Sequence, residues 1–180
     1  AFIFAAQMVN FPVLGGTSGH LLGAVLAAIL LGPWAGTLVM TSVIAVQSLL
    51  FQDGGLLAMG ANIVNMGLVG TIGGYAIYRT TARVLGGEEK RRLPAAAIAA
   101  WSAVMLGAAA TSFELAFSGT TTLAVVLPAM LGTHALIGIG EALITVGALA
   151  LIQSARPDLL QLRDVRGATP TGPAIEMIES

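Results

Sequence analysis

NFPVLGGTSGHLLG, residues 10–23, is the stretch where an otherwise lipid-like sequence gives way to glycines and polar side chains. Gly15, Gly16 and Gly19 permit backbone angles that other residues resist, so the chain can bend or unwind here at low cost. Irregular backbone persists inside a membrane only where it lines a cavity or is buried in protein. The stretch is therefore the first candidate for a binding site, and it carries His20, one of only two histidines.

The composition places the chain in a lipid environment. It has 180 residues, of which 56% are hydrophobic and only 9% are charged, whereas soluble domains carry about 25% charged residues. We therefore predict an all-α fold, a polytopic helical membrane bundle with about five to six transmembrane helices in this chain. The absence of cysteine excludes disulfides and thiolate metal sites. A net charge of −1 gives no indication of nucleic-acid binding, and no nucleic-acid partner is expected.

The basic residues lie in two groups that predict the topology. One group falls within residues 79–92 and the other within residues 156–166. Because loops rich in Lys and Arg face the cytoplasm, we expect both groups on the cytoplasmic side of the cell membrane, which the chain crosses several times. Residues 1–155 form the predicted transmembrane domain. Residues 156–180 are polar and contain prolines, which predicts a partly disordered cytoplasmic tail.

Four apolar runs are predicted to cross the membrane as single helices: residues 34–51, 59–78, 94–118 and 128–153. The last of these is expected to begin at Pro128, a favoured first helical position, which leaves residues 119–127 as an outer connection. The sequence Gln-Asp-Gly-Gly at residues 52–55 is expected to form a short outer turn.

Residues 14–31 allow two interpretations. The favoured one is a further spanning helix with its glycine-rich part in the outer half of the membrane, preceded by residues 1–9 as the end of an earlier helix. The alternative is a re-entrant half-helix over residues 21–31, only ~16 Å long at ~1.5 Å per residue, which would place His20 on the inner side. Under the favoured topology a polar pocket opens to the outside, which suits capture of a solute, and its charged or titratable members are His20, Asp53, Glu114 and His134.

Each titratable side chain has a functional and a structural interpretation. His20 can ligate nickel, cobalt or zinc through one ring nitrogen, or it can be a neutral histidine hydrogen-bonded between helices. His134 and Glu141 are seven residues apart and so share one helix face. They fit a proton or cation relay, support for a metal ligand, or a polar seam between helices. Asn62 lies three residues before Asn65, and both are expected to make interhelical hydrogen bonds.

Several long strings resemble one known family. FAAQMVNFPVLGGTSGHLLG, LLGPWAG, QDGGLLAMGANIVNMG and THALIGIGEALIT are similar to sequences of the cobalt/nickel substrate-capture subunits of energy-coupling-factor transporters, the CbiM/NikM family. The similarity extends, with short gaps, from about residue 1 to residue 153.

The resemblance implies a membrane subunit that takes Co(II) or Ni(II) from outside as its substrate, with no prosthetic group. Its implied partners are a coupling transmembrane subunit, two cytoplasmic ATPase subunits and, as an optional member, a small accessory membrane subunit. The capture subunit and its membrane partners lie in the lipid bilayer. The implied metal site is near-square-planar. Three of its ligands come from a Met-His start that is absent before Ala1, and the fourth corresponds to His20. The other pocket candidates are Asn10, Thr17, Ser18, Asn62, His134 and Glu141.

Three other functions remain open at this point. One is a capture subunit for an organic vitamin, and another is an intramembrane metal-dependent hydrolase built on His20, His134 and Glu141. The third is a scaffold whose polar residues only pack helices. The sequence has no HExxH, GxSxG or Walker motif, so we expect no enzyme activity and no ATPase in this chain. Cobalt and nickel accept the same nitrogen donors, so the sequence does not choose between them.

Overall fold

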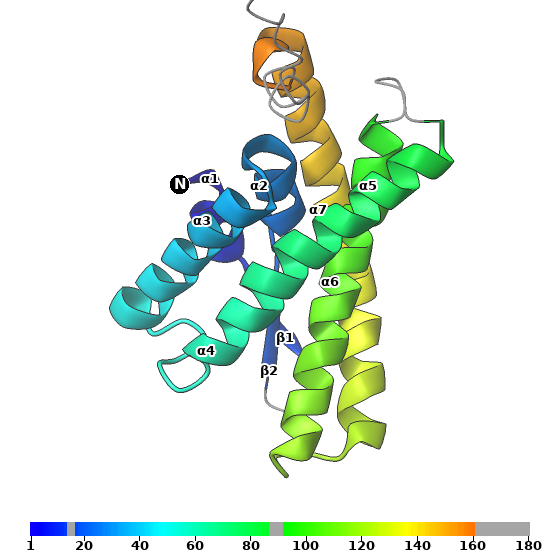
Figure 1. Ribbon diagram of the computed structural model, residues 1–180. Coiled ribbons are helices and arrows are strands. Elements are labelled where there is room, and N and C mark those ends of the chain that lie inside the picture. Colours follow the sequence, from blue (N-terminus) through cyan, green and yellow to red (C-terminus); the bar gives the residue numbers. More distant parts are fainter. Residues whose placement is uncertain (14–16, 87–91, 161–180) are drawn as a thin grey trace, which may run out of the picture.

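The computed structural model describes residues 1–13, 17–86 and 92–160 of the chain. The fold is an all-α bundle with one small β-hairpin (Figure 1), which confirms the predicted fold class. The α-helices are α1 (Phe2–Gln7), α2 (Ala24–Leu31), α3 (Pro33–Val46), α4 (Met59–Asn62), α5 (Gly74–Val84), α6 (Arg92–Phe117) and α7 (Leu123–Ala155). Two π-helical segments, η1 (Gln47–Phe51) and η2 (Ile63–Gly73), continue α3 and join α4 to α5. The strands are β1 (Asn10–Val13) and β2 (Thr17–His20).

Three helices in the described part are long and apolar enough to cross a membrane: Pro33–Phe51, Arg92–Phe117 and Leu123–Ala155. They coincide with three of the four predicted single-helix crossings. The fourth, residues 59–78, is also helical throughout, as α4, η2 and the first part of α5. The count of five to six crossings stays a prediction.

The helix ends agree with the predicted topology. The end of α5, the start of α6 and the end of α7 lie at one end of the bundle, and the α3–α4 and α6–α7 connections lie toward the other (Figure 1). The described basic residues of both groups therefore lie on the same side of the bundle: Arg79, Arg83, Arg92 and Arg156. The predicted tail beyond residue 160, together with Lys90 and Arg91, lies outside the described residues. That this side faces the cytoplasm stays a prediction.

The favoured prediction, a membrane-spanning helix over residues 14–31, is wrong. The strands β1 and β2 pair antiparallel in this region, with Asn10 opposite His20, and the helix α2 begins only at Ala24. Gly23 has left-handed backbone angles (φ 72°), which prevent the helix from extending back toward Leu21. At ~1.5 Å per residue, the eight residues of α2 cover ~12 Å, less than half of a bilayer core. The alternative interpretation, a half-helix over residues 21–31, is therefore closer to the observed length of α2.

The predicted start of the last helix at Pro128 is also wrong. The helix α7 begins at Leu123, after an extended Thr122 (φ −86°, ψ 141°), and Pro128 lies inside it. The connection is therefore shorter than residues 119–127. Pro128 has no N–H to donate to the carbonyl of Ala124, and its ring crowds that carbonyl. The burial of Val126 against the neighbouring helix α6 gives the extra turn its stability.

The core lies around α2, which contacts α3, η2, α5, α6 and α7. Small residues bring these helices close together. A Cβ added at Gly70 would lie 2.9 Å from the Cβ of Ala24, and one added at Gly74 would lie 2.6 Å from Cγ2 of Val25. On α6, Ala95 and Ala99 are also fully buried. Small side chains therefore allow the close approach of these helices.

Candidate functional site

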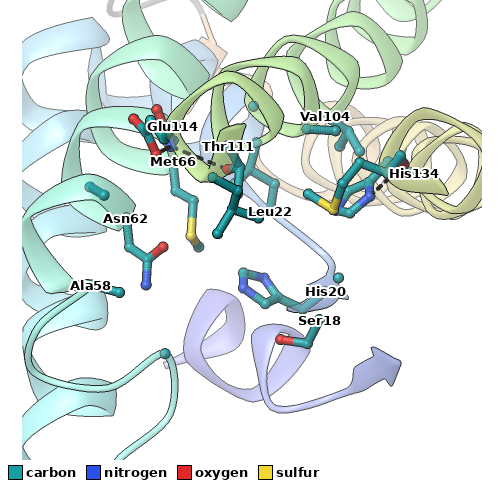
Figure 2. Close-up of a pocket in the computed structure, with 18 of the residues that line it drawn as sticks. Ser18, His20, Leu22, Ala58, Asn62, Met66, Val104, Thr111, Glu114 and His134 are labelled. Carbon is teal, nitrogen blue, oxygen red and sulfur yellow. Dashed lines mark hydrogen bonds between the residues drawn. The ribbon is translucent and has the colours of Figure 1, made fainter. Parts of the chain in front are cut away.

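A cavity of about 1030 Å³ lies beside the β-hairpin, toward the end of the bundle that holds the α3–α4 and α6–α7 connections. Its walls come from β2, the α3–α4 connection, α4, η2, α6 and α7 (Figure 2). No Lys or Arg is among its lining residues. The polar members of the lining are Ser18, His20, Asp53, Asn62, Asn65, Thr111, Glu114, Ser118, Thr120 and His134. The cavity therefore brings together the four titratable residues that the sequence placed on one side.

His20 is the last residue of β2, and its ring points into this cavity (Figure 2). Its Nδ1 lies 3.1 Å from the carbonyl oxygen of Leu21. With Nδ1 donating to that carbonyl, the lone pair of the imidazole is on Nε2, the nitrogen at the far end of the ring. His20 therefore presents a nitrogen donor to the cavity, as a metal-ligating histidine does when its other nitrogen is held by a carbonyl.

His134 packs against β2, the strand that carries His20. It projects from α7, is only 8% exposed, and its Nδ1 lies 2.8 Å from the carbonyl oxygen of Met130. The ring packs so closely against Gly19 that a Cβ added there would lie 2.9 Å from Nε2 of His134. His134 thus packs against the backbone of Gly19, directly before His20, and it also lines the cavity.

The opposite wall is held by amide hydrogen bonds. Asn65, which is 3% exposed, donates from Nδ2 to Oε2 of Glu114 at 2.8 Å and to Oγ1 of Thr111 at 3.2 Å. This confirms the predicted interhelical bonding for Asn65, whereas Asn62 lines the cavity. The sequence analysis missed Thr111, although its position three residues before Glu114 places both on one face of a helix.

Glu141 is not among the residues that line the cavity. It is 3% exposed, and its two carboxylate oxygens accept the backbone N–H groups of Leu22 at 2.8 Å and of Gly23 at 2.6 Å. The proposed hydrolase constellation of His20, His134 and Glu141 is therefore not present, since the carboxylate is engaged elsewhere. The contacts of Glu141 are those of a polar seam between helices.

The remaining predicted candidates lie on the hairpin. Ser18 lines the cavity beside His20. Asn10 and Thr17 are described only through their backbones, which pair with His20 and Val13 across the hairpin. Within the described ranges, no group of three or more His, Cys, Asp or Glu side chains is placed to hold a metal ion together. His20 and His134 are the imidazoles of the lining, set among amide, hydroxyl and carboxylate oxygens.

Comparison with known proteins gives a consistent match along the chain. Residues 1–159 match the family described as the cobalt uptake substrate-specific transmembrane region, CbiM. The chain is 33% identical over 177 residues to a fused nickel transport protein, NikMN, of Rhodobacter capsulatus, covering 91% of the chain and 51% of that protein. It is 31% identical over 173 residues to a cobalt transport protein, CbiM, of Sorangium cellulosum, covering 94% of the chain and 77% of that protein.

A solved structure agrees with the sequence match. The crystal structure of a transition metal transporter superposes with a TM-score of 0.80 at 33% identity, covering 93% of this chain and 79% of that one. The chain spans about half the length of some of its relatives: 51% of the Rhodobacter protein, and 55% of a 44% identical protein of Archaeoglobus fulgidus.

Proposed function

The chain belongs to the CbiM family of cobalt-uptake substrate-specific transmembrane regions, and from this premise we propose that it is the membrane subunit that captures Co(II) or Ni(II) for import. The observation that carries the proposal is the placement of His20. Its ring points from β2 into a polar cavity with its Nδ1 held by a carbonyl, so that Nε2 is directed at the cavity. An imidazole donor of this kind suits both ions.

The lining of the cavity supports a cationic substrate. Asp53 and Glu114 contribute the carboxylates of the lining, and no Lys or Arg is among the lining residues. Two carboxylates in a cavity raise the local concentration of a divalent cation. The surrounding amide and hydroxyl oxygens can bind the water molecules that the ion carries until nitrogen ligands replace them.

We propose that a coupling membrane subunit and two cytoplasmic ATPase subunits drive release of the ion, because the chain has no nucleotide-binding loop of its own. The support for this assembly is the family resemblance together with the naming of relatives as transport proteins. The cavity then opens outward, and the ends of α5 and α7 face the cytoplasm.

Equilibrium binding of Ni(II) and Co(II) tests the proposal. Two purified versions are compared: the chain as printed, and the chain preceded by a Met-His start and a first helix of the family type. We expect tight binding by the extended version and its loss on His20→Ala, by about 100-fold or more, since even the partners behind a ligand are worth about 10–100-fold. The matched control is Ser42→Ala, which changes an exposed hydroxyl that bonds only within its own helix.

Two results would contradict the proposal. If His20→Ala bound both ions as tightly as the unchanged protein, His20 would not be a ligand. If neither version bound either ion, the chain would not be a metal-capture subunit. Uptake of radioactive nickel by vesicles that contain the assembled complex extends the test to transport, because uptake should require ATP on the ATPase side and should fall with His20→Ala.

A further inference from the structure

One peptide group connects Glu141 to His20. The carbonyl of Leu21 and the N–H of Leu22 belong to the same planar unit and point in opposite directions. The carbonyl oxygen lies 3.1 Å from Nδ1 of His20. The N–H donates to Oε2 of Glu141 at 2.8 Å. The carboxylate, the peptide group and the imidazole therefore form a continuous line of hydrogen bonds that ends at the nitrogen facing the cavity.

The second carboxylate oxygen of Glu141 restrains this series of hydrogen bonds further. Oε1 accepts the N–H of Gly23 at 2.6 Å, so the carboxylate holds two successive backbone donors. Fixing two adjacent N–H groups fixes the orientation of the peptide plane between Leu21 and Leu22. The direction of the Leu21 carbonyl then follows from the position of Glu141 on α7.

Other contacts hold the same segment. Gln7 donates from Nε2 to the carbonyl of Leu22 at 2.7 Å, and His134 packs against Gly19 on the other side of His20. These contacts fix where the segment lies, but neither touches the peptide group that meets the imidazole. Within the described residues, Glu141 is the side chain that bonds to that group.

We infer that Glu141 is a positioning residue for His20, and that it holds the imidazole in the Nδ1–H tautomer through the Leu21–Leu22 peptide group. Metal-ligating histidines are commonly oriented by a carboxylate or a carbonyl at their second nitrogen. Here both are present in series, with the peptide group between them. A carboxylate that accepts the N–H polarises the peptide group and makes its carbonyl a stronger acceptor. The lone pair of His20 is thereby kept on Nε2, toward the cavity.

The test is a direct reading of the tautomer by nitrogen-15 NMR on the chain as printed, with labelled histidine and no metal present. The chain has only two histidines, so His134→Gln assigns the signals. In the unchanged protein, we expect Nδ1 of His20 to be protonated and Nε2 to be unprotonated. The reverse pattern in the unchanged protein would overturn the inference without any variant.

Two substitutions at residue 141 alter the carboxylate in different ways. Glu141→Gln keeps the shape but offers one acceptor oxygen to two N–H donors, and Glu141→Asp keeps the charge with a shorter reach. We expect each to lower the ratio of Nδ1–H to Nε2–H in His20 by about fivefold or more, the factor expected when a hydrogen bond of about 1 kcal/mol is lost. Either variant is sufficient if the other does not fold.

The matched control is Thr145→Val, one turn further along α7 at a site that is 1% exposed. It changes a buried polar side chain of the same helix without removing an acceptor from Leu22 or Gly23. We expect the tautomer of His20 to be unchanged in this variant. If both substitutions at residue 141 left the tautomer unchanged, or if Thr145→Val shifted it equally, Glu141 would have only a structural role.

A second measurement depends on the proposed function. In the extended, metal-binding version, Glu141→Gln should weaken Ni(II) binding by about 10–100-fold, and in the assembled transporter it should raise the KM of uptake more than it lowers the turnover rate. An unchanged affinity in a protein whose tautomer had shifted would overturn the link between tautomer and binding. The two failures are distinguishable, because loss of all metal binding would contradict the proposed function and leave the tautomer result in place.

Discussion

Around α2 the helices touch through atoms next to the backbone, whereas around His20 the same helices stand apart and enclose a cavity of about 1030 Å³. The packed region is α2 together with the residues of η2, α5 and α6 that contact it. The open region is the lining of the cavity. In the packed region glycine and alanine leave no room for an added methyl group. In the open region, polar and charged side chains stand beside glycine, alanine and larger apolar residues. Substitutions in the packed region should therefore change stability. In the open region, substitutions next to His20 should change binding, whereas loss of a buried, hydrogen-bonded amide should change stability.

The largest effect is expected from Gly74→Ala in the packed region. A Cβ at this position would lie 2.6 Å from Cγ2 of Val25 and 3.1 Å from the Cβ of Ala103. Val25 is stiff and buried, so the helices must move apart, at a cost of about 1–3 kcal/mol in the free energy of unfolding. Reversible unfolding in mixed micelles measures this change in the free energy of unfolding. Gly132→Ala on α7 is the control, because a Cβ there meets nothing within 4 Å; equal destabilisation by both variants would contradict the distinction.

Gly19→Ala lies at the border of the two regions. The added Cβ would lie 2.7 Å from Cδ1 of Ile137 and 2.9 Å from two ring atoms of His134, so either these side chains or β2 with His20 must shift. We expect nickel affinity in the extended version to fall by about tenfold, since partners behind a metal ligand contribute about 10–100-fold. Gly140→Ala is the matched control, with its nearest contact, Leu21, at an ordinary 3.8 Å. Unchanged affinity for Gly19→Ala would show that the cavity adapts to the shift.

A smaller effect is expected from Asn65→Ala in the wall of the cavity. The substitution removes the bonds to Thr111 and Glu114, and interhelical hydrogen bonds in membrane proteins contribute about 0.6 kcal/mol on average. We expect a loss of about 0.5–1.5 kcal/mol in the free energy of unfolding. Asn62→Ala should change the free energy of unfolding by less than about 0.5 kcal/mol, because the Asn62 side chain is partly exposed in the cavity. A larger loss for Asn62→Ala would reverse the assignment of these two amides.

The smallest effect is expected beyond the end of α7, outside both regions. Arg156 donates two hydrogen bonds to Asp158, and they lower the pKa of that carboxyl. A lowered carboxyl pKa adds stability that is present above the unfolded pKa and is lost as the pH falls through the folded pKa. Both side chains are exposed, so water screens the pair. Asp158→Asn should leave the unfolding midpoint unchanged at pH 7 and in acid, and a measurable shift would show that this turn is packed against something.

Much of the bundle could be predicted from residue type alone. Apolar runs of the required length, separated by Arg-rich and Gly-rich turns, predicted α3, α6 and α7 as single crossings, and the structure confirms their helices. The two errors have local causes. Hydrophobicity predicts a helix over residues 14–31, but the left-handed backbone of Gly23 keeps that helix from beginning before Ala24, and the strand residues before it pair with β1. Pro128 favours a helix start, but α7 begins earlier, at Leu123, where Val126 is buried.

The candidate site was only partly predictable. His20 could be singled out because a histidine in a glycine-rich interruption of a membrane sequence is rare, and the shared face of His134 and Glu141 follows from their spacing. Their different roles do not follow from spacing. His134 lines the cavity and Glu141 bonds to the backbone after His20, because the chain from β2 to α2 runs along α7 and meets His134 first and Glu141 further on.

By itself, the sequence determined that this chain is a helical membrane protein with its basic residues on one side and His20 in an irregular segment, because hydrophobic length, charge position and glycine content act locally. Only the tertiary structure decided which polar groups meet. The contact of Glu141 with Leu22 joins residues more than a hundred positions apart in the chain, and it lies where β2 and α2 pack against α7. Contacts of this kind depend on how several helices pack at once, which no local pattern records.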